Sequence, residues 1–464
     1  MRHRASLLSK VLGLCTTLGM TSCGEHVVVV ELSNLASNTT TVSAYYRIES
    51  DAYHASSLTS SQFPVGNPAF GIRPPEGRSG TMTVQVFAYK NNAPCELSKG
   101  STTVDVSGSG KLSATAALDA GAAAPGCSAN DAPVKYPSDA KVWAAAANNV
   151  WIVGKDAAVL HWNGSLFKEI SVPSSVLNGK IPTWNAVHGD SQGNVWLASD
   201  ADAVVRIDQS GAYSGFTLNF GSSTKNGIVW TGVYASGGQA ILSATTTADG
   251  NGYIGTVGVG QNVISVTQTT QAPISLPAVA SYGLHSIGCS SLDDCWFGGN
   301  QSVIVHYTKA AGYKTTLLAS GSSCTSQNSS VRVSAIYANA AVAKVKMLGH
   351  TSDGSDLGSR AGVFLTYAPA AAPNPDCFWS SDQDSSSMYV PGPLLGISGT
   401  SPDDLVVVGT DAMYRWKTST PVPIPGIDKT SWQSVSAVPG GFFAVSQRSM
   451  TDPMGRVYYA DLGP

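Results

Sequence analysis

The sequence is poor in charged residues. Of its 464 residues only 12% are Asp, Glu, Lys or Arg, about half of the roughly 25% found in an average soluble protein. Small residues, among them 48 glycines, fill the difference. This composition argues against long charged helices and favours short strands joined by many turns. The formal net charge of −3 shows no basic excess, so we expect no nucleic-acid partner.

No apolar run at the start of the chain is long enough to span a bilayer as a mature helix. Three basic residues lie within the first ten, and the short apolar stretch "VLGLCTTLGM" follows, a pattern typical of a signal peptide. The next residues, "MTSC" ending at Cys23, resemble a bacterial lipobox, although Met20 stands where Leu is usual. This resemblance implies a lipoprotein signal peptide over residues 1–22 and acylation of Cys23.

The alternative is an ordinary signal peptide that is cut near Ser22, with Cys23 incidental. Gly24, not Asp, follows the cysteine, and the resemblance to Gram-negative lipoproteins then implies the outer membrane, on its periplasmic or its outer side. Cleavage removes three basic residues and no acidic residue, which discourages peripheral binding to anionic lipid. The membrane is therefore expected as a partner through the acyl chains.

Cysteines are few, but their number is even once Cys15 and Cys23 are set aside. The others are Cys95, Cys127, Cys289, Cys295, Cys324 and Cys377. In an exported chain this predicts disulfides, and closeness in sequence favours 95–127, 289–295 and 324–377 among the open pairings. A zinc site is the competing interpretation. It requires C-x-x-C pairs, whereas "CSSLDDC" separates its cysteines by five residues, so we expect no metal ligands.

Tryptophan is absent from the first part of the mature chain. Residues 23–118 consist of short alternating segments such as "HVVVVEL", "TVSAYYRI" and "TMTVQVFAY", separated by turn-forming residues. They predict a β-sandwich of immunoglobulin or fibronectin type, without the Cys…Trp…Cys signature of true immunoglobulin domains. Residues 119–133, "DAGAAAPGCSANDAP", have the composition of a linker.

The rest of the chain, residues 134–464, repeats one phrase. "NNVWIVGKDAAVLHWNG" (148–164) returns as "DDCWFGGNQSVIVHYTK" (293–309) and "DDLVVVGTDAMYRWK" (403–417). A further apolar strand precedes each copy, and seven such strands recur at spacings of 38 to 61 residues. Their anchors are Trp143, Trp184, Trp230, Leu284, Val333, Leu394 and Trp432. Repeats of this length without helical periodicity predict a seven-bladed β-propeller.

The phrase also predicts how the blades pack. Its second strand is apolar throughout, because a blade is covered by a neighbour on both faces. The aromatic residues that close the third strand, Trp162, Tyr307 and Trp416, are expected to wedge between adjacent sheets. The pattern resembles a family of bacterial surface lipoproteins whose propeller repeats run approximately "DVWAVG…ILHW". This resemblance implies the architecture and carries little chemistry.

The end of the chain offers three strands where a blade requires four. An open edge would leave backbone donors and acceptors unpaired. We expect residues 132–138, "APVKYPS", to pair with the last blade and to close the ring.

One motif for catalysis occurs. "GDSQG", Gly189 to Gly193, matches the Gly-x-Ser-x-Gly nucleophile elbow with Ser191 as nucleophile, but a strand follows where a hydrolase has a helix. We expect a hairpin turn and no catalytic residue.

Two pairs of residues recur in register: His161 with His306, and Arg206 with Arg415. They predict packing or hydrogen-bonded ties, not ligands, because ligands require convergent partners. The acidic stretches at 351–359 and 380–387 lack the EF-hand pattern, and solvated loops are favoured over calcium sites. No cofactor motif is present, so we expect no cofactor.

Three functions stay open. The first is a non-enzymatic outer-membrane or cell-surface lipoprotein whose propeller binds protein, peptide or glycan, since propeller loops form recognition surfaces on a rigid scaffold. The second is a propeller glycosidase or polysaccharide lyase, which the scarcity of acids in the expected channel-lining strands disfavours. The third is a scaffold subunit of an envelope assembly complex.

Overall fold

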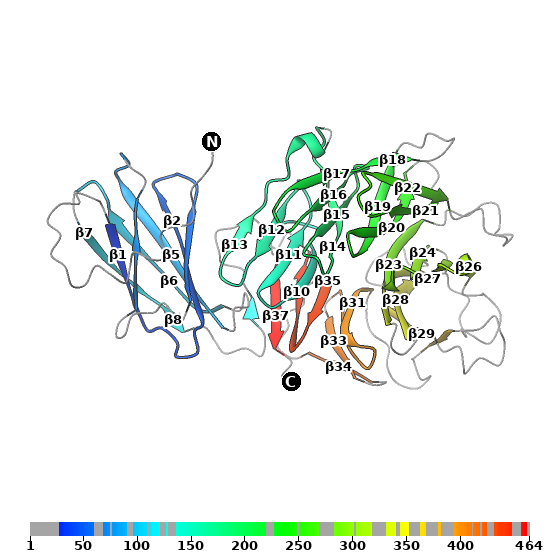
Figure 1. Cartoon of the computed structure of the whole chain (residues 1–464). Coiled ribbons are helices and arrows are strands. Elements are labelled where there is room, and N and C mark those ends of the chain that lie inside the picture. The colour runs from blue at the N-terminus through cyan, green and yellow to red at the C-terminus, as the bar shows by residue number, and fades with distance from the viewer. Residues whose placement is uncertain are drawn as a thin grey trace. The chain divides into compact units, whose positions relative to one another are not determined.

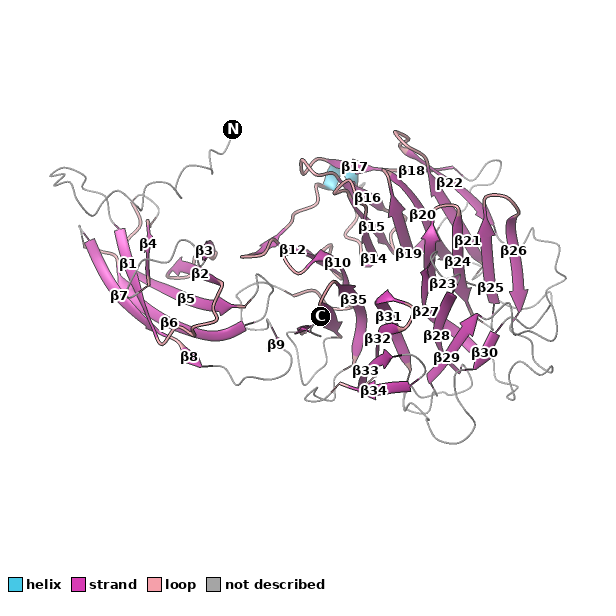
Figure 2. Ribbon diagram, turned by 60° about the horizontal axis from the view of Figure 1, so that its bottom comes forward, coloured by secondary structure: helices cyan, strands magenta, loops and turns pink. Residues whose placement is uncertain are grey.

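The computed structural model is built from strands, with one short 3-10 helix (η2, Ser174–Val176) among the described residues (Figures 1 and 2). It describes residues 27–59, 68–74, 77–90, 96–108, 111–120, 127–128, 136–177, 179–219, 227–247, 251–268, 283–300, 303–317, 331–339, 344–351, 362–367, 379–381, 393–410, 412–417, 420–424, 431–447 and 456–461. The chain folds into two units. The first is formed mainly by Met1–Ala123 and the second by Ala124–Asn130, Val134–Asn163 and Phe167–Pro464. The protein is all-β.

The first unit contains two sheets in its described part. One has the order β4 (Ala69–Ile72), β1 (Val27–Ser33) and β7 (Lys111–Ala117), and the other has the order β3 (His54–Thr59), β2 (Thr41–Ile48), β5 (Thr81–Tyr89), β6 (Glu96–Asp105) and β8 (Asp119–Ala120). Strands β1 and β7 pair in parallel, whereas the other neighbours are antiparallel. The sequence analysis missed β3 and β4, because "HASSLT" is mostly polar and "AFGI" alternates over only four residues.

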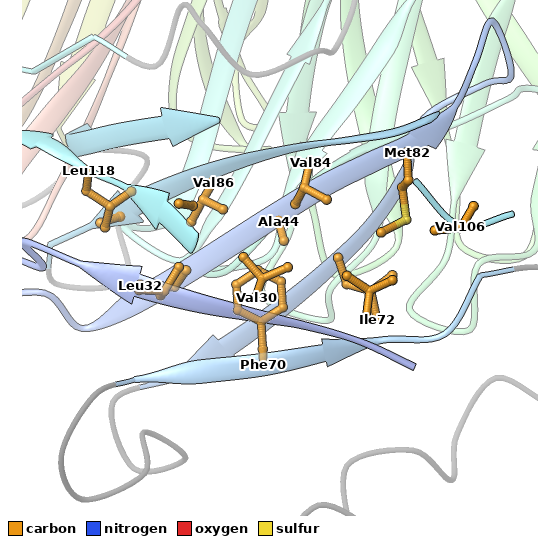
Figure 3. Packing of buried hydrophobic residues seen from close by; sticks show 14 of the residues in the cluster. Val30, Leu32, Ala44, Phe70, Ile72, Met82, Val84, Val86, Val106 and Leu118 are labelled. Atoms are coloured by element: carbon orange, nitrogen blue, oxygen red, sulfur yellow. The ribbon is translucent and has the colours of Figure 1, made fainter. Parts of the chain in front are cut away.

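Both sheets of this unit contribute side chains to one core, shown in Figure 3. Alternate residues of β1, such as Val28 and Val30, point into it, and Met82, Val84 and Val86 of β5 meet them. Such alternation is what a half-buried strand requires. Each of these side chains contributes about 1.5–3 kcal/mol by leaving water.

The second unit is a series of seven sheets in its described part. The first three are β10 (Lys141–Ala146), β11 (Asn149–Val153), β12 (Val159–Trp162) and β13 (Phe167–Glu169); β14 (Trp184–Gly189), β15 (Val195–Ser199), β16 (Val204–Ile207) and β17 (Tyr213–Gly215); and β19 (Ile228–Ser236), β20 (Gln239–Thr246), β21 (Gly252–Val257) and β22 (Val263–Gln268), with β18 (Thr217–Asn219) parallel to β22.

The remaining four sheets repeat the same antiparallel order. They are β23 (Leu284–Ser291), β24 (Asp294–Gly299), β25 (Val303–Thr308) and β26 (Gly312–Leu317); β27 (Val331–Asn339), β28 (Lys344–Thr351), β29 (Gly362–Tyr367) and β30 (Trp379–Ser381); β31 (Leu394–Ser401), β32 (Asp404–Gly409), β33 (Ala412–Lys417) and β34 (Thr420–Pro423); and β35 (Trp432–Val438), β36 (Gly441–Ser446), β37 (Val457–Asp461) and β9 (Cys127–Ser128). We number them sheets 1 to 7. All seven predicted anchors lie in the first strands: Trp184, Leu284, Leu394 and Trp432 are the first residues of their strands, and Trp143, Trp230 and Val333 lie two residues inside.

The first strands of successive sheets contact one another, from β10 and β14 through to β31 and β35, and β35 also contacts β10. The sheets therefore form a closed ring, in which the strands at the two ends of the second unit lie side by side in Figure 1. A separate apolar cluster lies between each pair of neighbours from sheets 1 and 2 to sheets 6 and 7. This explains why every residue of β15 is buried, as the apolar second strands predict.

Two of the three predicted aromatic wedges are confirmed by contacts with a neighbouring sheet. Trp416 stacks on Phe364 of the preceding sheet, with ring centroids 3.9 Å apart, and Tyr307 packs on the cluster that joins sheets 3 and 4. Trp162 is fully buried and contacts Phe167 of its own sheet.

The strand that completes sheet 7 differs from the prediction. Ser128 and Cys127 of β9 pair with Tyr458 and Tyr459 of β37. Of the predicted segment 132–138, residues 136–138 form no strand and the others lie outside the described residues. An early segment does supply the fourth strand, but it comes from within "PGCSAND", where glycine and small residues gave no strand signal.

Candidate functional site

The structure tests some of the predicted disulfides, because only some of the cysteines lie among the described residues. Cys289 and Cys295 form a disulfide between opposing positions of β23 and β24, which confirms that pairing. Cys127 lies in β9. Cys23, Cys95, Cys324 and Cys377 lie outside the described residues, so acylation and the other two pairings remain predictions.

The Gly-x-Ser-x-Gly motif forms the turn between β14 and β15, as expected, and Ser191 is exposed there. The neighbouring Asp190 is the buried residue of this turn. Its carboxylate accepts N–H bonds from Gln192 at 2.9 Å and Asn194 at 3.0 Å, and a third from Gly238 of sheet 3 at 2.9 Å. Burial opposes ionisation, but these hydrogen bonds hold the pKa of Asp190 below its usual value. Asp190 therefore joins the turns of two adjacent sheets.

The recurring third-strand residues form cross-strand ties. His161 Nε2 lies 3.0 Å from Asn149 Oδ1, and His306 Nε2 lies 2.7 Å from Asp294 Oδ1. Each histidine ring also stacks on the tryptophan opposite it, with centroids 4.2 Å and 3.7 Å apart.

The arginine at this position acts in the same way. Arg415 Nε and Nη2 both donate to the Asp404 carboxylate, at 2.8 and 2.6 Å, and this contact lowers the pKa of Asp404. Arg206 lies 5.7 Å from the centre of the opposing Trp196 ring. The predicted structural role is thus confirmed at all four positions.

The first strands of the ring carry an unusual set of ionisable residues. The first strands of the seven sheets contain no Asp or Glu; these strands are β10, β14, β19, β23, β27, β31 and β35. Their strongly basic and imidazole residues are Lys141, His188, His285 and Arg332. In a chain that is acidic overall, the innermost strands of the ring therefore carry positive charge.

The charge of Arg332 lowers the pKa of two of these residues, His285 and Lys141, which belong to other sheets. Arg332 Nη2 of β27 lies 3.4 Å from His285 Nδ1 of β23, a long contact in which the guanidinium is the donor. Burial, together with the charge of Arg332, lowers the pKa of His285 to about 4, so this ring is neutral near pH 7. We call Lys141, His285 and Arg332 the cationic cluster.

Lys141 enters the cluster from the far side of the ring. Burial lowers the pKa of Lys141; Asp139 opposes this shift, and the charge of Arg332 adds to it. Lys141 belongs to sheet 1 and Arg332 to sheet 5, and strands β10 and β27 are not neighbours in the ring.

His188 has a different, structural task. Its Nδ1 accepts the backbone N–H of Ala235 in sheet 3 at 3.2 Å, and its ring lies between Trp143 and Tyr234, with centroids 6.0 and 4.8 Å away. Burial lowers the pKa of His188 to about 4. Ser398 and Ser436 occupy the equivalent position in sheets 6 and 7 and accept the N–H of Ala437 and Ala144.

A β-bulge recurs near the start of the first strand in sheets 2 to 7. The bulged residue Asn185 donates to Trp230 O at 2.9 Å, and Thr231 donates to Leu284 O at 2.8 Å, each across a joint between sheets. His285 is the bulged residue of sheet 4. The bulge re-aims these side chains, and the sequence analysis missed it, because no residue type marks the position.

Three further observations concern only the described part of the chain. No group of three His, Cys, Asp or Glu side chains there could hold a metal ion. A cavity of about 330 Å³ in the first unit is lined by residues 31–35, Pro68 and Thr115, with Glu31 as its ionisable residue. No helix in the described residues has the length and apolar character needed to cross a membrane.

Known proteins match this chain in structure but not in sequence. No family model and no curated protein matches the chain. Among solved structures it is similar to YCF48 bound to D1 peptide (TM-score 0.47, 14% identity, 73% of this chain and 96% of that chain) and to the WD40 β-propeller domain of Doa1 (0.46, 12%, 70% and 94%). A glucose dehydrogenase is also similar (TM-score 0.37, 9% identity, 60% and 95%). The architecture and the site therefore rest on the strand pairing and contacts above.

Proposed function

We propose that the protein is a non-enzymatic lipoprotein of the bacterial outer membrane or cell surface, and that its ring binds a protein ligand. Cys23 carries the acyl anchor, residues 23–118 form a β-sandwich, and residues 134–464 form a seven-bladed β-propeller of the surface-lipoprotein type. Two sheets with one shared core support the sandwich. The ring of sheets with its closing strand supports the propeller.

One observation carries the binding function: the first strands hold Lys141, His285 and Arg332 and no carboxyl group. Glycoside hydrolysis uses a pair of carboxyl groups, one as acid and one as base or nucleophile. Positive charge on a rigid, closed scaffold favours instead the recognition of an acidic partner. Fold alone does not decide between these functions, and the composition of the innermost strands favours binding.

The proposal is tested by copurification. Full-length protein would be purified from detergent-solubilised membranes beside a Lys141→Glu/Arg332→Glu variant, and bound proteins and glycans would be compared. The matched control is Lys180→Glu, which alters an exposed lysine paired with Asp202 at 3.3 Å. We expect a protein partner with wild type and the control and its loss from the double variant. Equal recovery from all three, or no partner from any, contradicts the proposal.

The anchor is tested in the same cells. In a Cys23→Ser variant the protein should leave the membrane fraction, while the copurifying partner should remain bound. Equal partition of variant and wild type contradicts acylation and leaves the binding function untouched.

A further inference from the structure

The cavity of the first unit lies at the end of β1, where the outer face of this strand changes from apolar to polar. Val30 and Leu32 point into the shared core (Figure 3), so Glu31 and Ser33 lie on the opposite face of the strand. Nearer the start of β1 that face carries Val29. The cavity, of about 330 Å³, is therefore lined on this side by a carboxylate and a hydroxyl group.

Small residues on the neighbouring strands leave room beside Glu31. Its partners in register are Ala69 of β4 and Thr115 of β7. Neighbouring strands lie only about 4.8 Å apart, so side chains at paired positions adjoin one another on the same face. Alanine covers little of the carboxylate, which is exposed, and Thr115 offers a second hydroxyl group to the same cavity.

The turn that follows β1 adds both polar and apolar groups to the cavity. Asn34 has a φ of 62°, a left-handed conformation that asparagine adopts more readily than most residues. The N–H of Leu32 donates to Pro68 O at 2.8 Å, which holds Pro68 beside the end of β1. Leu35 and Pro68 supply apolar surface to the lining, and Asn34 supplies an amide.

The polar side chains of the cavity are available to a ligand. In the described part of the chain, no hydrogen bond or ion pair involves the side chains of Glu31, Ser33, Asn34 and Thr115. The described lining contains no Lys, Arg or aromatic residue. Its acceptors are a carboxylate, an amide oxygen and hydroxyl groups, so it favours a ligand that carries positive charge and several donors.

The lining suits a lysine side chain better than other cations. A metal ion such as Ca²⁺ takes about 6–8 oxygen ligands, commonly with several carboxylates, whereas Glu31 is the one carboxylate of the described lining. An amino sugar carries hydroxyl groups around its ring, which Leu35 and Pro68 would leave without partners. A lysine side chain combines an ammonium group, with three donors, and an apolar stem. Apolar surface can cover such a stem while the charged end meets polar groups.

We propose that this cavity binds the lysine side chain of a protein partner. The Glu31 carboxylate accepts a charge-assisted hydrogen bond from the ammonium group, and the Thr115 hydroxyl and the Asn34 amide oxygen accept the other two. Leu35 and Pro68 cover the methylene stem. A volume of about 330 Å³, at the lower end of the roughly 300–1,000 Å³ of ligand pockets, suits one side chain. The site belongs to the first unit, so it goes beyond the binding function proposed for the ring and does not rest on it.

Calorimetric titration of the full-length protein in detergent tests the proposal with four probes. They are the peptide acetyl-GGKGG-amide, the same peptide with Nε-acetyllysine, the same peptide with norleucine, and glucosamine. We expect the lysine peptide to bind. The acetyllysine and norleucine peptides should bind at least about tenfold more weakly, because a hydrogen bond between charged groups is lost. Glucosamine should also bind more weakly than the lysine peptide.

Variants of the cavity separate the site from the overall charge of the first unit. Glu31→Gln should weaken binding of the lysine peptide at least about tenfold. Asp119→Asn, which removes an exposed carboxyl group of β8 in the other sheet, should bind as wild type does. Thr115→Val should weaken binding several-fold, and Thr115→Ser, which keeps the hydroxyl group, should not. Because Glu31 is exposed, the thermal unfolding curves of Glu31→Gln and wild type should superimpose.

Several results contradict the proposal. They are no binding of the lysine peptide, equal binding by Glu31→Gln and wild type, or equal binding of the lysine and norleucine peptides. Tighter binding of glucosamine would make the ligand an amino sugar and would overturn the lysine assignment. The Lys141→Glu/Arg332→Glu variant should bind the lysine peptide as wild type does, and a loss there would contradict a site in the first unit. Failure of this site and failure of the ring's binding function are thus observed separately.

Discussion

The two units bury their apolar side chains in different ways. In the first unit, two sheets share one cluster, to which β1, β2, β4 and β5 all contribute. In the ring, separate clusters lie between successive sheets, and each of sheets 2 to 6 takes part in a cluster on either side. A cavity in the shared core should therefore affect the whole first unit, whereas a change in the ring acts at one joint between sheets. Three substitutions test this difference.

The largest effect is expected from Met82→Ala in the first unit. Met82 is fully buried in the shared core, so truncation loses the transfer free energy and leaves a cavity, at a cost of about 2–5 kcal/mol. Calorimetry should show the transition of the first unit moving to lower temperature while that of the ring stays in place. Met82→Leu, which conserves volume, is the control. A shift of both transitions together would contradict separate cores.

A smaller effect is expected from Gly189→Ala at the joint of sheets 1 and 2. A Cβ at this position would lie 2.2 Å from Cη2 of Trp143, and such overpacking costs about 1–3 kcal/mol. The control Gly108→Ala introduces a Cβ with no atom within 4 Å and should leave unfolding unchanged. Trp143→Leu combined with Gly189→Ala should be more stable than the sum of the single variants predicts. Additive losses would show that the indole does not set the glycine requirement.

The smallest effect is expected from Asp190→Asn at the turns of sheets 2 and 3. The amide retains one acceptor oxygen and loses the other, at a cost of about 1 kcal/mol near pH 7. Since the folded-state pKa of Asp190 is lowered, its contribution is present above about pH 4, the unfolded value, and is lost as pH falls through the folded value. The difference in free energy of unfolding between wild type and Asp190→Asn, measured with urea, should therefore shrink as the pH falls below about 4.

Asp208→Asn is the matched control for this prediction. Asp208 accepts Ser210 N–H and Ala212 N–H in a similar turn, but it is less buried than Asp190, and none of its described hydrogen bonds reaches a neighbouring sheet. The free energy of unfolding lost in Asp208→Asn should be smaller than that lost in Asp190→Asn. An equal loss, or a pH-independent difference at Asp190, would contradict the role of Asp190 as a link between sheets.

Much of the ring could be read from local pattern. The phrase around "NVWIVG" located the second and third strands, and the ties of His161 and His306 followed from their equal positions in it. Strands β3 and β4 could not be found in this way: "HASSLT" is mostly polar, and the alternation of β4 extends over only four residues. No motif joins Lys141, His285 and Arg332, so nothing in the sequence indicated the contact of Arg332 with His285.

Local alternation and repetition by themselves determined the all-β class, the seven first strands and the turn at Ser191, because side-chain periodicity reports which faces are buried. Only the tertiary structure decided which segments and side chains are neighbours in the ring. Residues 127–128 complete the sheet of residues 432–461, and Arg332 of sheet 5 lies 3.4 Å from His285 of sheet 4. Periodicity indicates that a face of a strand is covered, but it does not indicate which segment covers it. That segment is set by the closure of the ring, which brings distant parts of the chain together.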